Sequence, residues 1–204
     1  MENLMPDGTL EYYARNFKEF GESTFNVDFS STQERFLRHL PPKAAILDFG
    51  CGSGRDTSYF LQKGFSVTAT DGSPEMCRLA SANTGHEVKH LLFQELDAES
   101  AFDGIWACAS VLHLPKNELK DVFLRMEKAL KDNGILYVSF KYGSFEGIRN
   151  GRFFTDFTEN EFKDFLSQNS GMKIIDYWIT ADVRPERKEE KWLNLLIRKI
   201  SREI

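Results

Sequence analysis

The sequence predicts an α/β protein: a doubly wound, Rossmann-like sheet of seven mostly parallel strands with an antiparallel edge hairpin and an N-terminal helical cap. Three observations carry this prediction. Short apolar runs alternate with amphipathic stretches between residues 43 and 143, which is typical of βαβ units with right-handed crossovers. Two late apolar runs follow one another with no helical stretch between them. A loop with three glycines directly follows the first of the alternating runs.

The N-terminal cap is expected to contain two helices. Apolar side chains recur near helical spacing between Leu10 and Phe20, so one stripe of this helix should face the protein. Ser31 stands three residues before Glu34, which is the spacing of a capping box at the start of a second helix. Two consecutive prolines then close the cap.

The remaining elements follow from period, length and turn residues. The expected strands are residues 44–49, 65–71, 87–94, 102–112, 135–143, 172–180 and 191–200. The expected helices are residues 55–63, 73–83, 116–134 and 158–171. The long third helix should end at Asn133-Gly134, and the fourth should begin with a capping box formed by Thr158 and Glu161.

Composition and charge narrow the classes of function. The 204 residues are 41% hydrophobic and 28% charged with a net charge of −5, which argues against broad binding to nucleic acid phosphates. No run approaches the roughly 18 apolar residues of a membrane span, and the first residues lack the layout of a signal peptide, so a cytoplasmic location is expected. Three scattered cysteines form no CxxC pair, and no metal or disulfide is expected.

The loop in LDFGCGSGRD follows the first expected strand, at the end of the sheet where doubly wound proteins bind ligands. Gly50, Gly52 and Gly54 would let the backbone approach a ligand closely. Arg55 stands where a dinucleotide fingerprint needs its third small residue, so a dehydrogenase is only the runner-up for this fold. Asp48 would repel a pyrophosphate but suits a ligand that carries an ammonium and a sulfonium.

At these motifs the chain resembles the class I S-adenosylmethionine-dependent methyltransferases. LDFGCGSGRD resembles their first motif, and TATDGSPEM resembles the segment in which an acid receives the ribose hydroxyls. FQELDAES, FDGIWACASVLHLP and LKDNGILYVSFKYG are similar to the motifs around the third, fourth and fifth strands. The resemblance covers residues 44–143 and is greatest to small stand-alone bacterial enzymes of the tellurite-resistance and small-molecule type.

The resemblance implies a single methyltransferase domain over residues 1–204. Residues 1–42 would form a helical cap or lid, residues 43–143 the cofactor-binding core, and residues 144–204 a substrate-side loop, a helix and the terminal strand pair. The implied cofactor is S-adenosyl-L-methionine, with S-adenosyl-L-homocysteine as product after in-line transfer of a methyl group to a small molecule. Neither a nucleic acid nor a membrane is expected as a partner, and the protein would be a monomer or homodimer.

The resemblance also implies a set of cofactor contacts. The glycine loop would hold the methionine part, Asp71 the ribose, and Met76 a face of the adenine, unless Met76 is only a core residue. Asp97 would contact the adenine amino group, with Glu95 as the alternative. The expected cofactor-binding residues are Asp48, Gly50, Cys51, Gly52, Ser53, Gly54, Asp71, Gly72, Ser73, Met76, Leu96, Asp97, Ala109 and Ser110.

Five further residues are expected in the acceptor pocket because of their place after strands or in the cap: Tyr13, His113, Lys141, Asp182 and Arg184. His113 is either a general base or a packing residue, and Tyr13 is either a lid residue or a core contact. No catalytic base is assigned.

Basic residues on the same side suggest a cationic pocket for an anionic substrate, with Arg149 and Arg152 beside Lys141 and Arg184. Two other functions stay open. A tRNA methyltransferase would need a basic face for RNA. The other is a non-catalytic S-adenosylmethionine-binding module; a module that kept the fold but not the cofactor would have no physical need for the intact glycine loop and Asp71.

Overall fold

The computed structural model describes residues 8–184 and 187–200. Residues 1–7 of the predicted cap and residues 201–204 at the end of the predicted domain lie outside the described residues.

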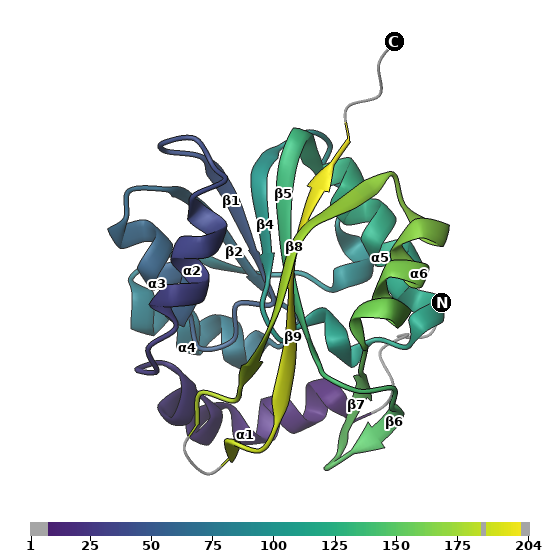
Figure 1. The fold of residues 1–204 in the computed structure, drawn as a ribbon. Helices are drawn as coiled ribbons and strands as arrows, with labels where there is room; N and C mark the ends of the chain where they lie inside the picture. The colour runs from purple at the N-terminus through teal and green to yellow at the C-terminus, as the bar shows by residue number, and fades with distance from the viewer. Residues whose placement is uncertain (1–7, 185–186, 201–204) are drawn as a thin grey trace.

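Seven strands form one sheet in the order β3-β2-β1-β4-β5-β9-β8 (Figure 1). They are β1 (Ala45–Phe49), β2 (Ser66–Asp71), β3 (Val88–His90), β4 (Phe102–Ala107), β5 (Leu130–Lys141), β8 (Met172–Ala181) and β9 (Lys191–Lys199). The first five strands pair in parallel, whereas β9 is antiparallel to β5 and β8 is antiparallel to β9. The predicted fold class, including the antiparallel edge hairpin, is confirmed.

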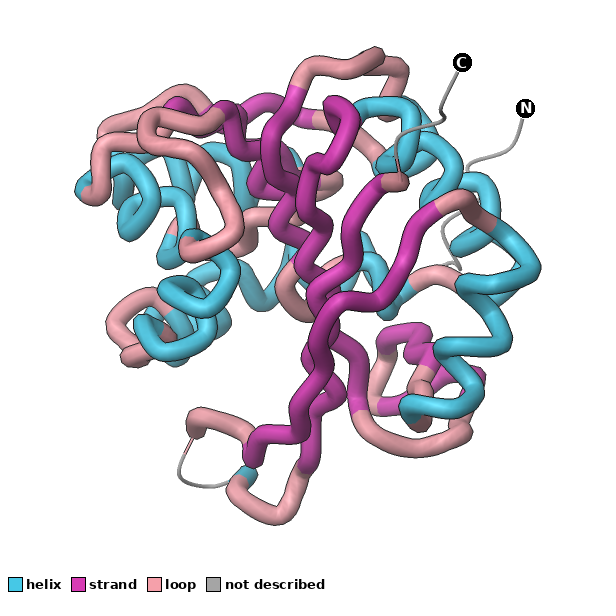
Figure 2. The backbone as a smooth tube through the Cα atoms, turned by 45° about the horizontal axis from the view of Figure 1, so that its top comes forward, coloured by secondary structure: helices cyan, strands magenta, loops and turns pink. Residues whose placement is uncertain are grey.

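Helices cover both faces of the sheet (Figure 2). One face carries α2 (Ser30–Leu37), α3 (Arg55–Gln62) and α4 (Pro74–Thr84), and the other carries α5 (Lys116–Ala129) and α6 (Glu159–Asn169). The first helix, α1 (Thr9–Thr24), lies across the carboxyl ends of the strands and contacts α4 (Figure 1). The ligand end of the sheet is therefore roofed by the N-terminal helix.

The two-residue period of a strand explains why both faces hold apolar cores. In β4, Ile105 and Ala107 pack with the α5 and α6 side, while Trp106 packs with the α2 and α3 side. Trp106 stacks on Tyr137 of β5 with ring centroids 3.9 Å apart. Because both faces are buried, the ends of these strands are held in fixed positions.

The helix α5 ends five residues earlier than predicted, at Ala129 instead of Gly134. Leu130 is fully buried and pairs with Phe102, so β5 begins at once. Asn133, with φ of 62°, lies inside an irregularity of β5 rather than at a helix end. Core burial of Leu130 thus outweighs the local turn signal.

The third and fourth strands are shorter than predicted. β3 stops at His90, and a 3-10 turn, η1 (Phe93–Glu95), follows it. β4 stops at Ala107, because Ala109 has φ of 49° and the chain then enters a second 3-10 turn, η2 (Val111–His113). This turn carries His113 to the carboxyl end of the sheet.

Of the two predicted capping boxes, the one at α6 is confirmed, with Thr158 and Glu161 bonded reciprocally. The box at Ser31 is wrong: α2 starts at Ser30 and has no side-chain cap. Glu34 instead accepts a hydrogen bond from the Tyr59 hydroxyl at 2.6 Å and pairs with Lys63.

Part of the predicted substrate-side loop is a hairpin of β6 (Glu146–Arg149) and β7 (Arg152–Thr155). Asn150 and Gly151 form its two-residue turn with φ of 51° and 74°. Asn-Gly is a strong signal of a two-residue hairpin turn, and the sequence interpretation overlooked it. The hairpin contacts η2 and α1, so it walls the ligand end of the sheet.

Within the described ranges, no helix is both long and apolar enough to cross a membrane.

Candidate active site

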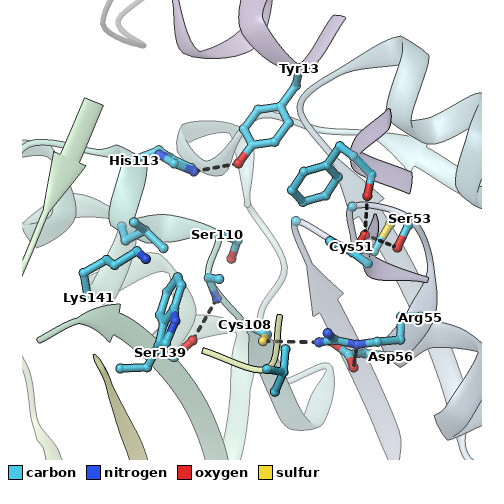
Figure 3. Close-up of a pocket in the computed structure, with 18 of the residues that line it drawn as sticks. Tyr13, Cys51, Ser53, Arg55, Asp56, Cys108, Ser110, His113, Ser139 and Lys141 are labelled. Carbon is cyan, nitrogen blue, oxygen red and sulfur yellow. Dashed lines mark hydrogen bonds and ion pairs between the residues drawn. The ribbon is translucent and has the colours of Figure 1, made fainter. Parts of the chain in front are cut away.

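A cavity lies between α1 and the carboxyl ends of β1, β2, β4 and β5. At one end it is lined by the glycine loop, and at the other by residues of β5, β7 and β9. Figure 3 shows Cys51, Ser53 and Arg55 on one side, His113 and Lys141 on the other, and Tyr13 pointing in from above. The cavity extends from the glycine loop to these strand residues, so different chemical groups of a ligand could contact its two ends.

The glycine loop, residues 50–54, directly follows β1 and is tightly packed. Gly50, Gly52 and Gly54 have φ of 82°, 56° and 84°, a region that side chains rarely adopt. A Cβ on Gly50 would lie 2.5 Å from the Cβ of Ser110. The N–H groups of Gly50 and Cys51 both donate to the carbonyl of Thr70 at 2.9 Å. The loop can therefore keep its shape only with glycine at these positions.

Asp71 ends β2 and lines the cavity. Its carboxylate accepts hydrogen bonds from the N–H of Gly52 and the N–H of Ser73, each at 2.9 Å. Burial raises the pKa of Asp71 to about 6, although these N–H groups act in the opposite direction. Each carboxylate oxygen has two acceptor sites, so Asp71 can still accept hydroxyl groups of a ligand.

Beside Asp71 the cavity wall is apolar. Met76 and Phe93 are buried, and Leu10 and Phe20 of α1 lie on the same cavity. Apolar walls with a single anionic group are typical of a small-molecule site.

Tyr13, His113 and Arg152 form one hydrogen-bonded chain. His113 Nδ1 lies 2.7 Å from the carbonyl oxygen of Phe153, which can only accept, so Nδ1 carries the proton. His113 Nε2 therefore accepts from the Tyr13 hydroxyl at 2.9 Å (Figure 3). Arg152 Nη1 donates to the Tyr13 oxygen at 3.3 Å.

Burial sets the charge state of this chain. It lowers the pKa of His113 to about 4, with Arg152 acting in the same direction, although the bond to the Phe153 carbonyl opposes the shift. It also raises the pKa of Tyr13. Near pH 7 both side chains are neutral, and the Tyr13 hydroxyl donates a hydrogen bond to the unprotonated Nε2 of His113.

The far wall of the cavity is cationic. Arg184 forms a double hydrogen bond with Asp182, at 2.9 and 2.7 Å. Burial opposes ionisation of Asp182, but the bonds from Arg184 and Trp192 prevail and lower its pKa to about 2. Lys141 contacts Glu190 and lies over the ring of Trp192; burial lowers the pKa of Lys141 to about 8, against the attraction of Asp182.

Comparison with known proteins gives a consistent result. Residues 46–134 match the family model of a methyltransferase domain. The chain is 31% identical over 154 residues to the 2-methyl-6-phytyl-1,4-hydroquinone methyltransferase of Synechocystis sp., an alignment covering 65% of this chain and 47% of that protein. The chain spans about half the length of the curated relatives it matches.

Among solved structures, the 1,6-didemethyltoxoflavin-N1-methyltransferase of Burkholderia thailandensis, bound to 1,6-didemethyltoxoflavin and S-adenosylhomocysteine, superposes with a TM-score of 0.71 and 25% identity. That superposition covers 98% of this chain and 94% of the other. A TehB-like S-adenosylmethionine-dependent methyltransferase of Corynebacterium glutamicum shares the fold, with a TM-score of 0.67 at 19% identity over 93% of this chain and 97% of that one.

Residues 46–134 are a methyltransferase domain of the class I, S-adenosylmethionine-dependent type. Its cofactor is S-adenosylmethionine. The methyltransferase site fits this molecule on its own geometry. Gly50 and Gly52 leave no Cβ in the way, Asp71 offers free acceptor sites for the ribose, and Met76 and Phe93 offer an apolar surface for the adenine.

Most of the residues expected at the cofactor site of the methyltransferase line the cavity. They are Gly50, Cys51, Gly52, Ser53, Asp71, Gly72, Met76, Ala109 and Ser110. All five candidate pocket residues line it as well: Tyr13, His113, Lys141, Asp182 and Arg184. Their individual roles stay predictions.

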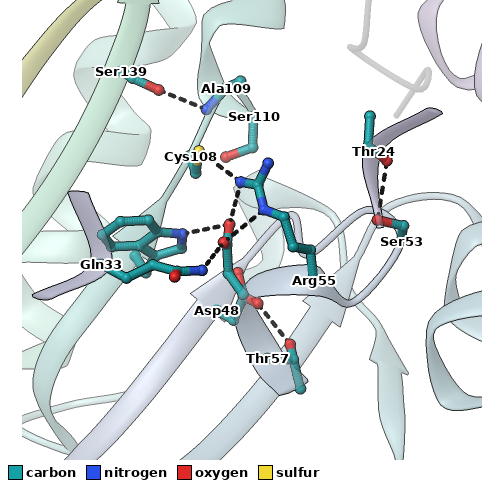
Figure 4. A network of polar contacts seen from close by, with 12 residues as sticks. Thr24, Gln33, Asp48, Ser53, Arg55, Thr57, Cys108, Ala109, Ser110 and Ser139 are labelled. Atoms are coloured by element: carbon teal, nitrogen blue, oxygen red, sulfur yellow. Dashed lines mark hydrogen bonds and ion pairs between the residues drawn. The ribbon is translucent and has the colours of Figure 1, made fainter. Parts of the chain in front are cut away.

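Five expected cofactor residues do not reach the cavity wall: Asp48, Gly54, Ser73, Leu96 and Asp97. Asp48 lies beneath the loop, 2% exposed, and accepts from the Thr57 hydroxyl at 2.6 Å (Figure 4). Burial, with Asp56 nearby, raises its pKa, so it does not offer a free anion to the ligand.

The other four are displaced for local reasons. Gly54 faces α4, where a Cβ would meet Thr84 at 2.7 Å, and Ser73 caps α4 by accepting from Met76 N–H. Leu96 packs into the core after η1, while Asp97 points to solvent. The open choice between Asp97 and Glu95 for the adenine amino group is not decided, because neither lines the cavity.

A polar network that was not expected from the sequence lies beneath the methyltransferase cavity (Figure 4). Asp56 accepts from Gln33 Nε2 at 2.6 Å, from Trp106 Nε1 at 2.9 Å, and from Arg55 at 2.9 Å. The Asp56 carboxylate neutralises the charge of Arg55, and a further contact with Cys108 Sγ at 3.7 Å helps to fix its position. No local pattern could have found these partners, since Gln33 and Trp106 come from other elements.

Proposed function

We propose that this protein transfers a methyl group from S-adenosylmethionine to an N–H or O–H group of a small molecule. The observation that carries the proposal is one continuous cavity that runs from the glycine loop and Asp71, past the Tyr13–His113 pair, to the wall around Lys141. Because α1 covers the cavity, the acceptor would have to fit inside it completely, which suits a small molecule. The 1,6-didemethyltoxoflavin-N1-methyltransferase, which binds the small molecule 1,6-didemethyltoxoflavin, supports the same class.

We further propose a division of labour along the chain. Residues up to 42 act as the lid through α1, residues 43–143 hold the cofactor, and residues 144–204 supply the acceptor side through β7 and β9. This follows from which elements line each end of the cavity.

Bound S-adenosylmethionine supplies an electrophilic methyl carbon for in-line displacement. The protein's part is alignment, which can contribute roughly 7–11 kcal/mol to lowering such a barrier. The Tyr13 oxygen can accept the proton that the acceptor nitrogen or oxygen loses, while the Tyr13 proton moves to His113 Nε2 over 2.9 Å. The neighbouring Arg152 destabilises the imidazolium formed, which favours return of its proton to solvent after the transfer.

The test is formation of S-adenosylhomocysteine from S-adenosylmethionine in the presence of small amines, heteroaromatic N–H compounds, phenols and thiols, with tRNA as a parallel substrate. We expect turnover with at least one N–H or O–H compound. Turnover with tRNA alone would favour the RNA methyltransferase. Binding of S-adenosylhomocysteine without turnover of any acceptor would favour the non-catalytic module.

Replacement of Tyr13 by phenylalanine is expected to lower kcat for that acceptor by about 10²-fold, the lower end of general acid–base effects. The affinity for S-adenosylhomocysteine, measured by calorimetry, should stay within a few-fold of wild type. Equal kcat for both proteins would contradict a role of Tyr13 in proton transfer.

The pH dependence gives the sign of the His113 contribution. Because the neutral imidazole is the proton acceptor and its pKa is about 4, kcat/KM should be independent of this group above pH 6 and fall as the pH drops toward 4. Measured with saturating S-adenosylmethionine, so that protonation of Asp71 does not limit cofactor binding, His113→Gln should remove this acid limb and lower the plateau. Retention of the same limb in His113→Gln would assign it to another group, such as Asp71.

A further inference from the structure

We infer that Arg152 binds an anionic group, a carboxylate or a phosphate, on the methyl acceptor. This inference rests on the proposed function and names the class of its substrate.

The first observation is the free edge of the Arg152 guanidinium. Arg152 begins β7, and its guanidinium lies 4.4 Å from the ring centroid of Tyr12, 5.1 Å from that of Phe154 and 5.7 Å from that of Tyr13. Nη1 donates to Tyr13, whereas the buried Nε–H has no hydrogen-bond partner among the described residues. A buried donor without a partner is costly, which indicates that a ligand completes it.

The geometry of that edge selects the ligand. Nε and Nη2 are the two donors that bind a carboxylate or phosphate side by side, and no bond from Nη2 is found within residues 8–184 and 187–200. The three rings hold the guanidinium plane in place, so little freedom is lost when an anion binds.

The second observation is the charge balance of the wall. Arg149 pairs with Asp156 at 2.7 Å, Arg184 pairs with Asp182, and Lys141 contacts Glu190. Arg152 has no carboxylate within ion-pair distance in the described part of the chain. These three cations are already paired, whereas Arg152 and Arg187 have no ion pair among the described residues, and of the two only Arg152 has a buried donor without a hydrogen-bond partner.

The third observation is where Arg152 stands. It borders both the main cavity and a second cavity lined by Arg149, Lys141 and Arg187, away from the glycine loop. Its link to Tyr13 places a bound anion beside the Tyr13–His113 pair, with the rest of the acceptor next to the proton-accepting groups. A bound anion would also offset the effect by which Arg152 lowers the pKa of His113, and so make His113 a stronger base when the acceptor is present.

The same chemistry could come from the carboxylate of the cofactor itself, and the experiment separates the two sources. Calorimetry would first measure S-adenosylhomocysteine and methylthioadenosine, which lacks the carboxylate, with wild type and with Arg152→Gln. The protein loaded with S-adenosylhomocysteine would then be titrated with 4-hydroxybenzoate, phenyl phosphate and the neutral 4-hydroxybenzamide.

We expect at least one of the two anions to bind wild type at least tenfold more tightly than the amide does. In Arg152→Gln this preference should vanish while the affinity for S-adenosylhomocysteine is kept, which also shows that the variant is folded. Arg152→Lys, which keeps the charge but not the two-donor edge, should retain only part of the preference. Arg38→Gln, an exposed arginine beyond α2, is the matched control and should leave the preference unchanged.

Three results would overturn the inference. In the first, Arg152→Gln weakens S-adenosylhomocysteine but not methylthioadenosine, which would place the cofactor carboxylate on Arg152. In the second, the anions bind no better than the amide. In the third, wild type and Arg152→Gln show equal preference. Failure of wild type to bind S-adenosylhomocysteine at all would instead reject the proposed function.

Discussion

Replacement of Asp71 by alanine is expected to weaken the binding of S-adenosylhomocysteine by at least tenfold. The carboxylate can accept hydroxyl hydrogen bonds from the ribose while holding the N–H groups of Gly52 and Ser73. Each charge-assisted bond contributes about 1.5–3 kcal/mol, and about 1.4 kcal/mol corresponds to a factor of ten. The alanine variant also frees the Gly52 N–H, so the loop itself loses a support.

The control for Asp71→Ala is Asp97→Ala. Asp97 is exposed and does not line the cavity, so calorimetry should give wild-type affinity for this variant. A loss at Asp97 as large as that at Asp71 would restore the adenine contact that the family resemblance implies. Unchanged affinity of Asp71→Ala would contradict the ribose assignment.

The pH dependence of S-adenosylhomocysteine binding is a second test of the role of Asp71. With a pKa of about 6 in the free protein, Asp71 loses its charge as the pH falls below 6, and the affinity for S-adenosylhomocysteine should fall with it. Above pH 7 the carboxylate is ionised and the affinity should no longer depend on this group. The slope should be absent in Asp71→Ala.

The fold was predictable where local sequence and tertiary packing agree. The apolar run that ends at Phe49, the glycine loop behind it and Pro74 at the start of α4 each specify one local structure, and the sheet buries that structure without changing it. At Asn133 the two levels disagree, because the turn signal there competes with full burial of Leu130. In such cases tertiary packing determines the local structure, and these long-range contacts cannot be read from the local sequence.

The candidate site divides in the same way. Residues directly after strands, such as Asp71 and Lys141, could be placed because parallel strands end at one edge of the sheet. The partners of those residues could not be. Arg152 meets Tyr13 across 139 positions of sequence, and Asp48 was misjudged because its orientation toward Thr57 depends on how α3 packs. The local sequence can thus predict that a residue lies at the end of a strand, but it cannot predict that residue's hydrogen-bond partners.

Gly50 and Gly64 allow the close approach of the loop to be tested apart from backbone conformation. Their φ angles are 82° and 83°. A Cβ on Gly64 would meet nothing within 4 Å, whereas a Cβ on Gly50 would lie 2.5 Å from the Cβ of Ser110. Gly64→Ala should therefore cost only the strain of a left-handed alanine, about 1–2 kcal/mol in the free energy of unfolding, with unchanged affinity for S-adenosylhomocysteine.

Gly50→Ala carries the same strain and an overlap in a packed site, which costs about 1–3 kcal/mol more, and the displaced loop should bind S-adenosylhomocysteine at least tenfold more weakly. Denaturant unfolding and calorimetry on both variants measure the two effects. Removing the Ser110 side chain in a Gly50→Ala, Ser110→Gly double variant should recover part of the loss, because the overlapping atom is gone. The prediction would be wrong if Gly50→Ala and Gly64→Ala lose the same stability and bind S-adenosylhomocysteine equally well. Only the backbone conformation would then require glycine at position 50, and the loop would be able to move away from Ser110.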